Sequence, residues 1–149
     1  PLLACALASA FGRPTLMLLV HNPAVLGAMG WLYNGQGLTI DFIGWLSVHG
    51  TTELFAILLA GAAGLHIGRS MAFPGERPLV QAAAEAGRRA ALVMTGVVLM
   101  LIAAALLEAF PRQLVDNTPG RLTIGGFMLT FWLIYFYALR PRRTSEAGA

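Results

Sequence analysis

A histidine and a glutamate lie four positions apart within an otherwise apolar stretch, His49-Gly-Thr-Thr-Glu53. Side chains four residues apart share one face of an α-helix, so the imidazole and the carboxylate can meet if a helix begins at or before His49. A charged group inside a membrane-spanning helix costs about 2.5–3.5 kcal/mol by insertion scales. We therefore expect Glu53 to face the protein interior and to have a partner there.

Glu108 is a second carboxylate at the edge of a long apolar run. If successive runs cross a membrane in alternating directions, Glu53 and Glu108 lie near the same side of it. We therefore predict that His49, Glu53 and Glu108 share one depth and can form a buried polar cluster within the membrane.

Three kinds of site fit this cluster: a hydrogen-bonded group that holds two helices together, a proton- or ion-coupled site of a permease, and a metal site. The metal alternative is weak, because the zincin pattern needs two histidines four apart and a glutamate. A Ser/His/Asp triad is weaker still, since Ser47 lies near His49 but no aspartate is placed to orient the ring. We expect no catalytic residue, no enzymatic activity and no cofactor.

Other reactive residue types add no further site. Cys5 is the single cysteine and excludes a disulfide or a cysteine-based metal site within one chain. His66 is interpreted as a helix-contacting or interfacial histidine. The pI near 9.8 does not indicate nucleic-acid binding, because the arginines fall between apolar runs. The Gly125-Gly126 pair lacks a phosphate-loop context.

The composition indicates an integral membrane protein. Apolar residues make up 57% of the 149 residues and charged residues 11%, whereas an average soluble domain carries about 25% charged residues. A spanning helix needs about 17–25 mostly apolar residues. We predict an all-α fold, a polytopic transmembrane helix bundle with about four spans and a short interfacial or re-entrant segment. The spans are placed at 15–33, 49–68, 90–110 and 122–139, and the short segment at 38–48.

The spans form one predicted transmembrane domain, residues 1–140, and a polar cytoplasmic tail follows at 141–149. The chain begins within apolar sequence, so we expect N-terminal residues of a longer polypeptide to be missing. Gly12-Arg13-Pro14 predicts a break before the first complete span. Pro23 removes a backbone donor inside that span, and we expect His21 or Asn22 to supply hydrogen bonds near it.

Small residues are concentrated in the span at 49–68. Gly61, Gly64 and Gly68 fall on successive turns, and the last two form a G-x-x-x-G pair. Glycines on one helix face let two backbones approach closely in lipid. We predict that these three glycines mediate helix packing inside the bundle.

The arginines predict the orientation. With four alternating spans, eight of the ten basic residues fall on one side, and only Arg112 and Arg121 on the other. Positive charge is enriched in cytoplasmic loops. We therefore expect a multi-pass membrane protein, with the 69–89 connection and the C-terminus in the cytoplasm.

Several motifs follow one another in a characteristic order. They are Asn22 with Gly27, His49-Gly50-x-x-Glu53-Leu54-x-Ala56, Ala60-Gly61-Ala62-Ala63-Gly64-Leu65-x-x-Gly68, Pro74-Gly75, and Glu108-Ala109-Phe110. This order, over residues 9–110, resembles the stage II sporulation protein M family of bacterial multi-span membrane proteins. Asn22-Pro23 departs from the Asn-Gly that family members commonly carry, and Arg13-Pro14 is also unusual there.

The resemblance implies an anchor or scaffold of the bacterial cytoplasmic (inner) membrane, without established catalysis of its own. The sporulation member of the family belongs to a peptidoglycan-remodelling complex with two enzymatic partners. The partners expected from this resemblance are the lipid bilayer and other membrane or envelope proteins, including peptidoglycan hydrolases. Further copies of the chain are a compatible partner, and nucleic acid is not expected.

Overall fold

The computed structural model describes the backbone of residues 2–138 and the side chains of 12–111 and 114–138. The described chain is helical and contains no strand. Its elements are α1 (Leu2–Gly35), α2 (Thr39–Ala72), α3 (Leu79–Ala109), α4 (Pro111–Leu114), α5 (Thr118–Leu133) and the π-helical turn η1 (Ile134–Ala138). The predicted tail at 141–149 lies outside the described residues.

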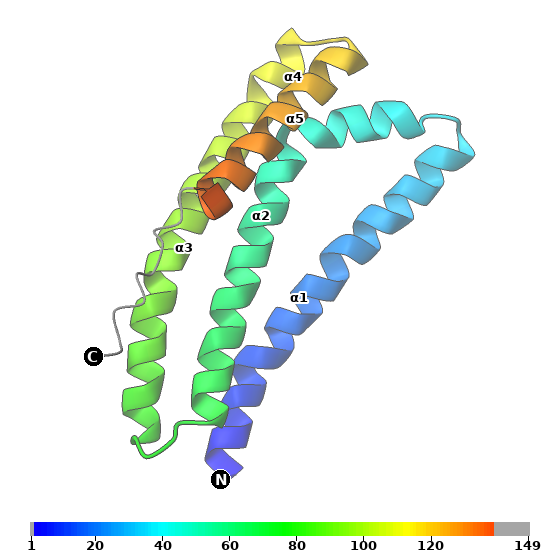
Figure 1. Ribbon diagram of the computed structural model, residues 1–149. Coiled ribbons are helices and arrows are strands. Elements are labelled where there is room, and N and C mark those ends of the chain that lie inside the picture. The colour runs from blue at the N-terminus through cyan, green and yellow to red at the C-terminus, as the bar shows by residue number, and fades with distance from the viewer. Residues whose placement is uncertain (1, 139–149) are drawn as a thin grey trace.

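Four helices are long and apolar enough to cross a membrane: α1, α2, α3, and α5 together with η1. The predicted all-α bundle with four spans is therefore confirmed. The chain turns between α1 and α2 at one end of the bundle, where α4 also lies, and between α2 and α3 at the other (Figure 1). We call these the α4 end and the α2–α3 end.

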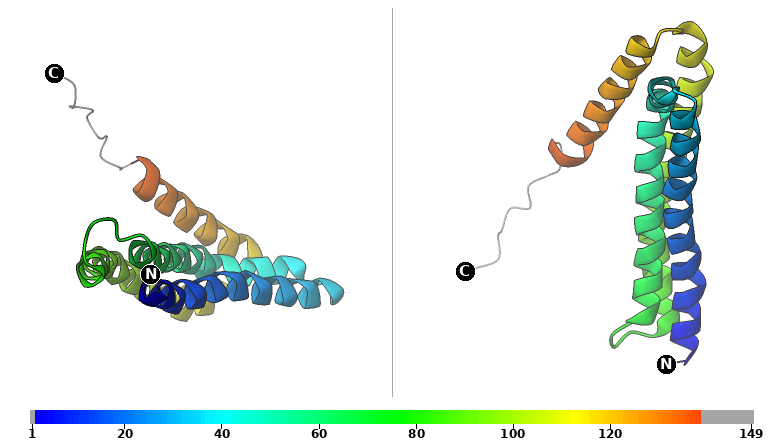
Figure 2. Two further views of the ribbon diagram at one scale, coloured as in Figure 1. Left: turned by 90° about the horizontal axis from the view of Figure 1, so that it is seen from below. Right: turned by 90° about the vertical axis from the view of Figure 1, so that its right-hand side faces the viewer.

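Helix α2 is the centre of the bundle. It packs against α1, α3 and α5, whereas α3 and α5 share few direct contacts. Figure 2 shows the reason: as α5 runs down from the α4 end, it slants away from α3. The bundle therefore consists of a central helix, α2, with α1, α3 and α5 packed around it.

Helix α1 corrects one prediction. The prediction of a break at Gly12-Arg13-Pro14 is wrong, because α1 is continuous and contains both Pro14 and Pro23. A proline inside a helix frees backbone groups, and membrane helices tolerate this when side chains or neighbouring helices satisfy them. Asn22 Nδ2 donates a hydrogen bond to the Leu18 carbonyl at 2.8 Å. This hydrogen bond lies near Pro23, as expected, but the carbonyl that Pro23 leaves without a donor is that of the next residue, Leu19.

Helix α2 corrects a second boundary. The segment at 38–48 was expected to be separate from the span beginning at His49, but α2 runs without interruption from Thr39 to Ala72. Its first turns cross the α4 end before the helix bends toward the α2–α3 end (Figure 1). Gly37, with φ 74°, allows the preceding turn. The Thr39 hydroxyl donates to Asn34 Oδ1 at 2.9 Å across that turn.

The remaining spans begin earlier than predicted. Helix α3 starts at Leu79 rather than near residue 90, so its first turns form part of the same helix as the apolar run. Helix α5 starts at Thr118, where the Asn117 side chain accepts a hydrogen bond from the Gly120 backbone N–H at 2.7 Å. Asparagine is a favourable N-cap because it satisfies one of the free N–H groups of the first turn.

The interior is built mainly from small side chains. The buried apolar residues include six alanines, and Val97 and Met100 form a cluster with Ala56. Large side chains such as Met17 and Leu92 are 72% and 78% exposed. This arrangement is typical of membrane bundles, in which small residues bring the helices together and large apolar residues face lipid.

Candidate functional site

His49 is buried against the aromatic residues at the α4 end. Only 5% of its surface is exposed, and its ring lies edge-on to Trp45 with 5.3 Å between centroids. Trp45 continues a row of rings through Phe42 to Tyr33 at the end of α1. His49 Nδ1 is buried without a hydrogen-bond partner within the described residues. The imidazole is thus shielded from the membrane and retains an unused polar atom.

The two carboxylates are less buried than His49. Glu53 follows one turn later on α2 and is half-buried, and Glu108 is half-buried in the last turn of α3. In the described part of the chain, no hydrogen bond or ion pair joins Glu53 to His49. No three His, Cys, Asp or Glu side chains described here are grouped so that they could hold a metal ion. The geometry gives the metal alternative no support, and a shared cluster of the three residues stays a prediction.

Thr52 connects α2 to α5. It is fully buried, and its hydroxyl accepts a hydrogen bond from Trp132 Nε1 at 2.9 Å. One turn away, Phe55 stacks on Phe136 with 5.7 Å between ring centroids. A polar contact flanked by stacked rings fixes the position of α5 along α2, because the indole N–H has no water in lipid as an alternative partner.

Nearer the α4 end, the backbones of α2 and α5 come close together. A Cβ atom added to Gly125 would lie 2.6 Å from both Cβ and the carbonyl oxygen of Ser47. The Ser47 hydroxyl donates to the Arg121 carbonyl at 3.1 Å. At the start of α5, Thr118 packs over Gly44 and donates to Asp41 Oδ1 at 3.1 Å. Small residues on both helices thus permit a close crossing, which we call the α2–α5 seam (Gly44, Ser47, Thr52, Gly125, Trp132).

The predicted packing glycines lie farther along α2. A Cβ atom on Gly61 would meet the Leu19 side chain at 2.6 Å, and one on Gly64 would meet Thr15. Both neighbours belong to α1, so these two glycines seat α1 on α2. Gly68 is buried one turn later. His66, interpreted as interfacial or helix-contacting, is exposed near the α2–α3 end.

Sequence reasoning did not identify the α2–α5 seam. Gly44 and Ser47 are three residues apart, as are Thr52 and Phe55, so each pair shares a helix face. This spacing was the available signal, but it does not name the partner helix. The sequence indicates only that the Gly125-Gly126 pair is not a phosphate loop, whereas the structure shows that Gly125 lets Ser47 approach the α5 backbone.

The fold and the apolar spans define the class of the protein, a polytopic α-helical membrane protein. The family model described as Stage II sporulation protein M matches residues 1–111. The chain therefore belongs to the stage II sporulation protein M family, as the order of its motifs predicted. The match includes α1, α2 and α3, while α5 lies beyond it. Comparisons with curated proteins and with solved structures find no match.

Proposed function

We propose that the protein is a non-enzymatic scaffold of the bacterial cytoplasmic membrane that holds cell-envelope proteins together, including proteins that remodel peptidoglycan. Membership of a sporulation-related membrane family supports this proposal. A scaffold of this kind acts by presenting helix surfaces to other membrane proteins rather than by assembling reactive groups.

The observation that carries the proposal is the exposed surface of the outer helices. In an apolar 18-residue stretch of each span, no residue of α1 is buried and 6% of the α5 residues are buried, compared with 28% of those in α2. Both outer helices pack chiefly on α2. Their remaining faces are thus available to transmembrane helices of partner proteins, which associate by close packing in lipid.

In the proposed orientation the α2–α3 end is cytoplasmic. Arg69, Arg77, Arg88 and Arg89 lie in or beside the connection at this end, whereas Arg121 lies at the α4 end. Cytoplasmic segments carry the excess of arginine and lysine. The α4 end and the His49 region then face the cell wall, where peptidoglycan hydrolases act.

The scaffold proposal is tested by photo-cross-linking in native membranes. A photoreactive phenylalanine analogue replaces Met17, which is 72% exposed on α1, and in a matched variant it replaces Val98, 52% exposed on α3. We expect Met17 to capture a membrane-anchored envelope protein and Val98 to capture mainly lipid. Capture of lipid alone at both positions would contradict the proposal that the exposed face of α1 binds partner proteins.

A proton- or ion-coupled permease is the second candidate. It is favoured by the Nδ1 atom of buried His49, which has no hydrogen-bond partner among the side chains and backbone that the structure describes. Buried ionisable residues within a membrane often mark proton or ion pathways. Proteoliposomes carrying the protein and a pH-sensitive dye test this alternative under an imposed gradient. Flux that is lost in His49→Phe would support the permease, and absence of flux in the unaltered protein would argue against it.

A further inference from the structure

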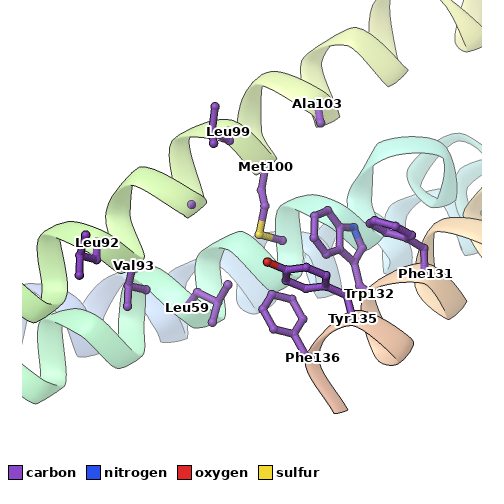
Figure 3. A pocket seen from close by; sticks show the side chains of 11 residues that line it. Leu59, Leu92, Val93, Leu99, Met100, Ala103, Phe131, Trp132, Tyr135 and Phe136 are labelled. Atoms are coloured by element: carbon purple, nitrogen blue, oxygen red, sulfur yellow. The ribbon is translucent and has the colours of Figure 1, made fainter. Parts of the chain in front are cut away.

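The space between α3 and α5 is an apolar groove of about 440 Å³. Its walls include Leu92, Gly96 and Met100 of α3, Leu59 of α2, Trp132 of α5 and Phe136 of η1. Figure 3 shows Met100 reaching from α3 toward the aromatic side chains on the opposite wall. The groove is open because α5 slants away from α3 and because Gly96 has no side chain to fill it. A Cβ atom added to Gly96 would meet nothing within 4 Å.

A polar cavity of about 390 Å³ adjoins this groove at the α2–α3 end. It is lined by Gln81, Ala84, Glu85, Arg88, Arg89 and Leu92. Leu92 lines both spaces, so the two meet at this residue on α3. Arg88, Leu92 and Gly96 are four residues apart and occupy successive turns on one face of that helix. The combined space is therefore apolar along most of its length and basic at one end.

The polar cavity has a surplus of positive charge. Glu85 is its acidic residue, and its two carboxylate oxygens accept from Arg77 and Arg89 at 2.6 Å each. Arg88 is exposed and forms no ion pair within the described part of the chain. Glu85 is thus already neutralised by its neighbours, and the Arg88 guanidinium remains available to an anion.

The basic end lies at the depth of lipid headgroups. Residues 90–109 of α3 extend over about 30 Å, at roughly 1.5 Å per residue, which equals the hydrocarbon thickness of a bilayer. When the apolar part of α3 spans the membrane, Arg88 lies at one interface and Gly96 lies within the hydrocarbon. The apolar part of the groove therefore lies at the depth of acyl chains.

We propose that this combined space, the α3–α5 groove, binds one anionic diacyl phospholipid from the leaflet at the α2–α3 end. The phosphate contacts Arg88 and, beside it, Arg89, while an acyl chain lies between α3 and the aromatic wall of α5. Basic pockets at helix surfaces recognise anionic headgroups by charge. A bound acyl chain also supplies the packing that α3 and α5 do not give each other.

Trp132 provides a fluorescent probe inside the groove. In the Trp31→Phe, Trp45→Phe background it is the remaining tryptophan, and its emission reports contact with lipids brominated on their acyl chains. The protein is reconstituted in phosphatidylcholine vesicles that contain brominated phosphatidylglycerol or, in a parallel sample, brominated phosphatidylcholine. We expect stronger quenching by the phosphatidylglycerol at equal mole fraction.

Two pairs of variants separate the groove from the general membrane surface. Arg88→Gln should lower the preference for phosphatidylglycerol about fivefold, the effect of one basic residue near a charged interface. Arg69→Gln, also exposed at the α2–α3 end but outside the groove, is the control. Gly96→Leu fills the groove and should reduce quenching by both lipids. Gly126→Leu, which likewise adds a side chain into open space, should leave quenching unchanged.

Native mass spectrometry of the protein with all its tryptophans gives a second measurement that does not depend on the fluorescent background. We expect one retained phosphatidylglycerol, which is lost in Gly96→Leu. Equal quenching by both brominated lipids, or equal effects of Arg88→Gln and Arg69→Gln, would overturn the proposal. Stronger displacement of brominated phosphatidylglycerol by polyprenyl phosphate than by an equal amount of unlabelled phosphatidylglycerol would overturn the assigned occupant.

Discussion

The indole N–H of Trp132 on α5 donates a hydrogen bond to the hydroxyl of Thr52 on α2, with 2.9 Å between the two atoms. Thr52 is completely buried, whereas Trp132 also lines the α3–α5 groove. This pair therefore lies between the tightly packed α2–α5 seam and the open side of α5. It fixes which face of α5 is turned toward the groove.

Thr52→Val tests the contribution of this hydrogen bond to stability. Valine keeps the shape of threonine and leaves the Trp132 N–H without its acceptor. We expect the free energy of unfolding to fall by about 0.6–2 kcal/mol, the range for side-chain hydrogen bonds between membrane helices. Thr95→Val is the matched control, because the Thr95 hydroxyl is exposed and donates within its own helix to Ala91. Equal destabilisation of both variants, measured by steric trapping in bicelles, would contradict the role of Thr52.

Gly125→Ala tests the close crossing at the α2–α5 seam. The added methyl group would lie 2.6 Å from the Ser47 backbone oxygen, so α5 must move away from α2. We expect a loss of about 1–3 kcal/mol, the usual cost of overpacking. Gly126→Ala places the same group in open space and should be neutral or stabilising by up to about 1 kcal/mol from helix propensity. Thermal unfolding in detergent compares the two, and a lower Tm for Gly126→Ala than for Gly125→Ala would disagree with the packing.

The composition and the length of the apolar segments predicted the four helices, because a helix exposed to lipid needs a long apolar segment however it packs. They did not predict the boundaries. Pro14 and Arg13 favoured a break that the continuous α1 does not have, and the segment before His49 proved to be the first part of α2. A helix end within a bundle depends on which neighbour satisfies its backbone, and this information is not local.

The candidate site was predictable only in part. His49 lies within an apolar stretch and its imidazole is buried, while its predicted cluster with Glu53 and Glu108 stays a prediction. The α2–α5 seam was not predictable, because Thr52 and Trp132 are far apart in sequence and meet only through the crossing of two helices. Glycines were informative about close approach but not about partners: Gly64 contacts α1, while Gly125 contacts α2.

A disulfide cross-link tests the register of α1 against α2. The Cβ of Thr15 lies 3.3 Å from a Cβ built on Gly64. This is close to the Cβ–Cβ distance of about 3.5–4.5 Å in disulfides. In a Cys5→Ser background, Thr15→Cys with Gly64→Cys should cross-link on mild oxidation, detected as a mobility shift that reductant reverses. Met17→Cys with Gly64→Cys should not, because Met17 is 72% exposed on another face of α1. Cross-linking of the Met17 pair alone would show a different register after Pro14.

Substitutions at His49 separate a structural from a functional role of the buried imidazole. His49→Phe keeps an aromatic ring against Trp45 and removes the buried Nδ1 atom, for which the described residues offer no partner. Replacing an unsatisfied polar group by an apolar one of similar shape is nearly neutral or stabilising. We therefore expect the free energy of unfolding of His49→Phe to be unchanged or raised, by up to about 1 kcal/mol. His49→Ala leaves a cavity and should lower it by about 2–4 kcal/mol. If His49→Phe instead destabilised the protein as strongly as His49→Ala, Nδ1 would have a partner in the membrane, and the polar cluster with Glu53 would become the first place to look for it.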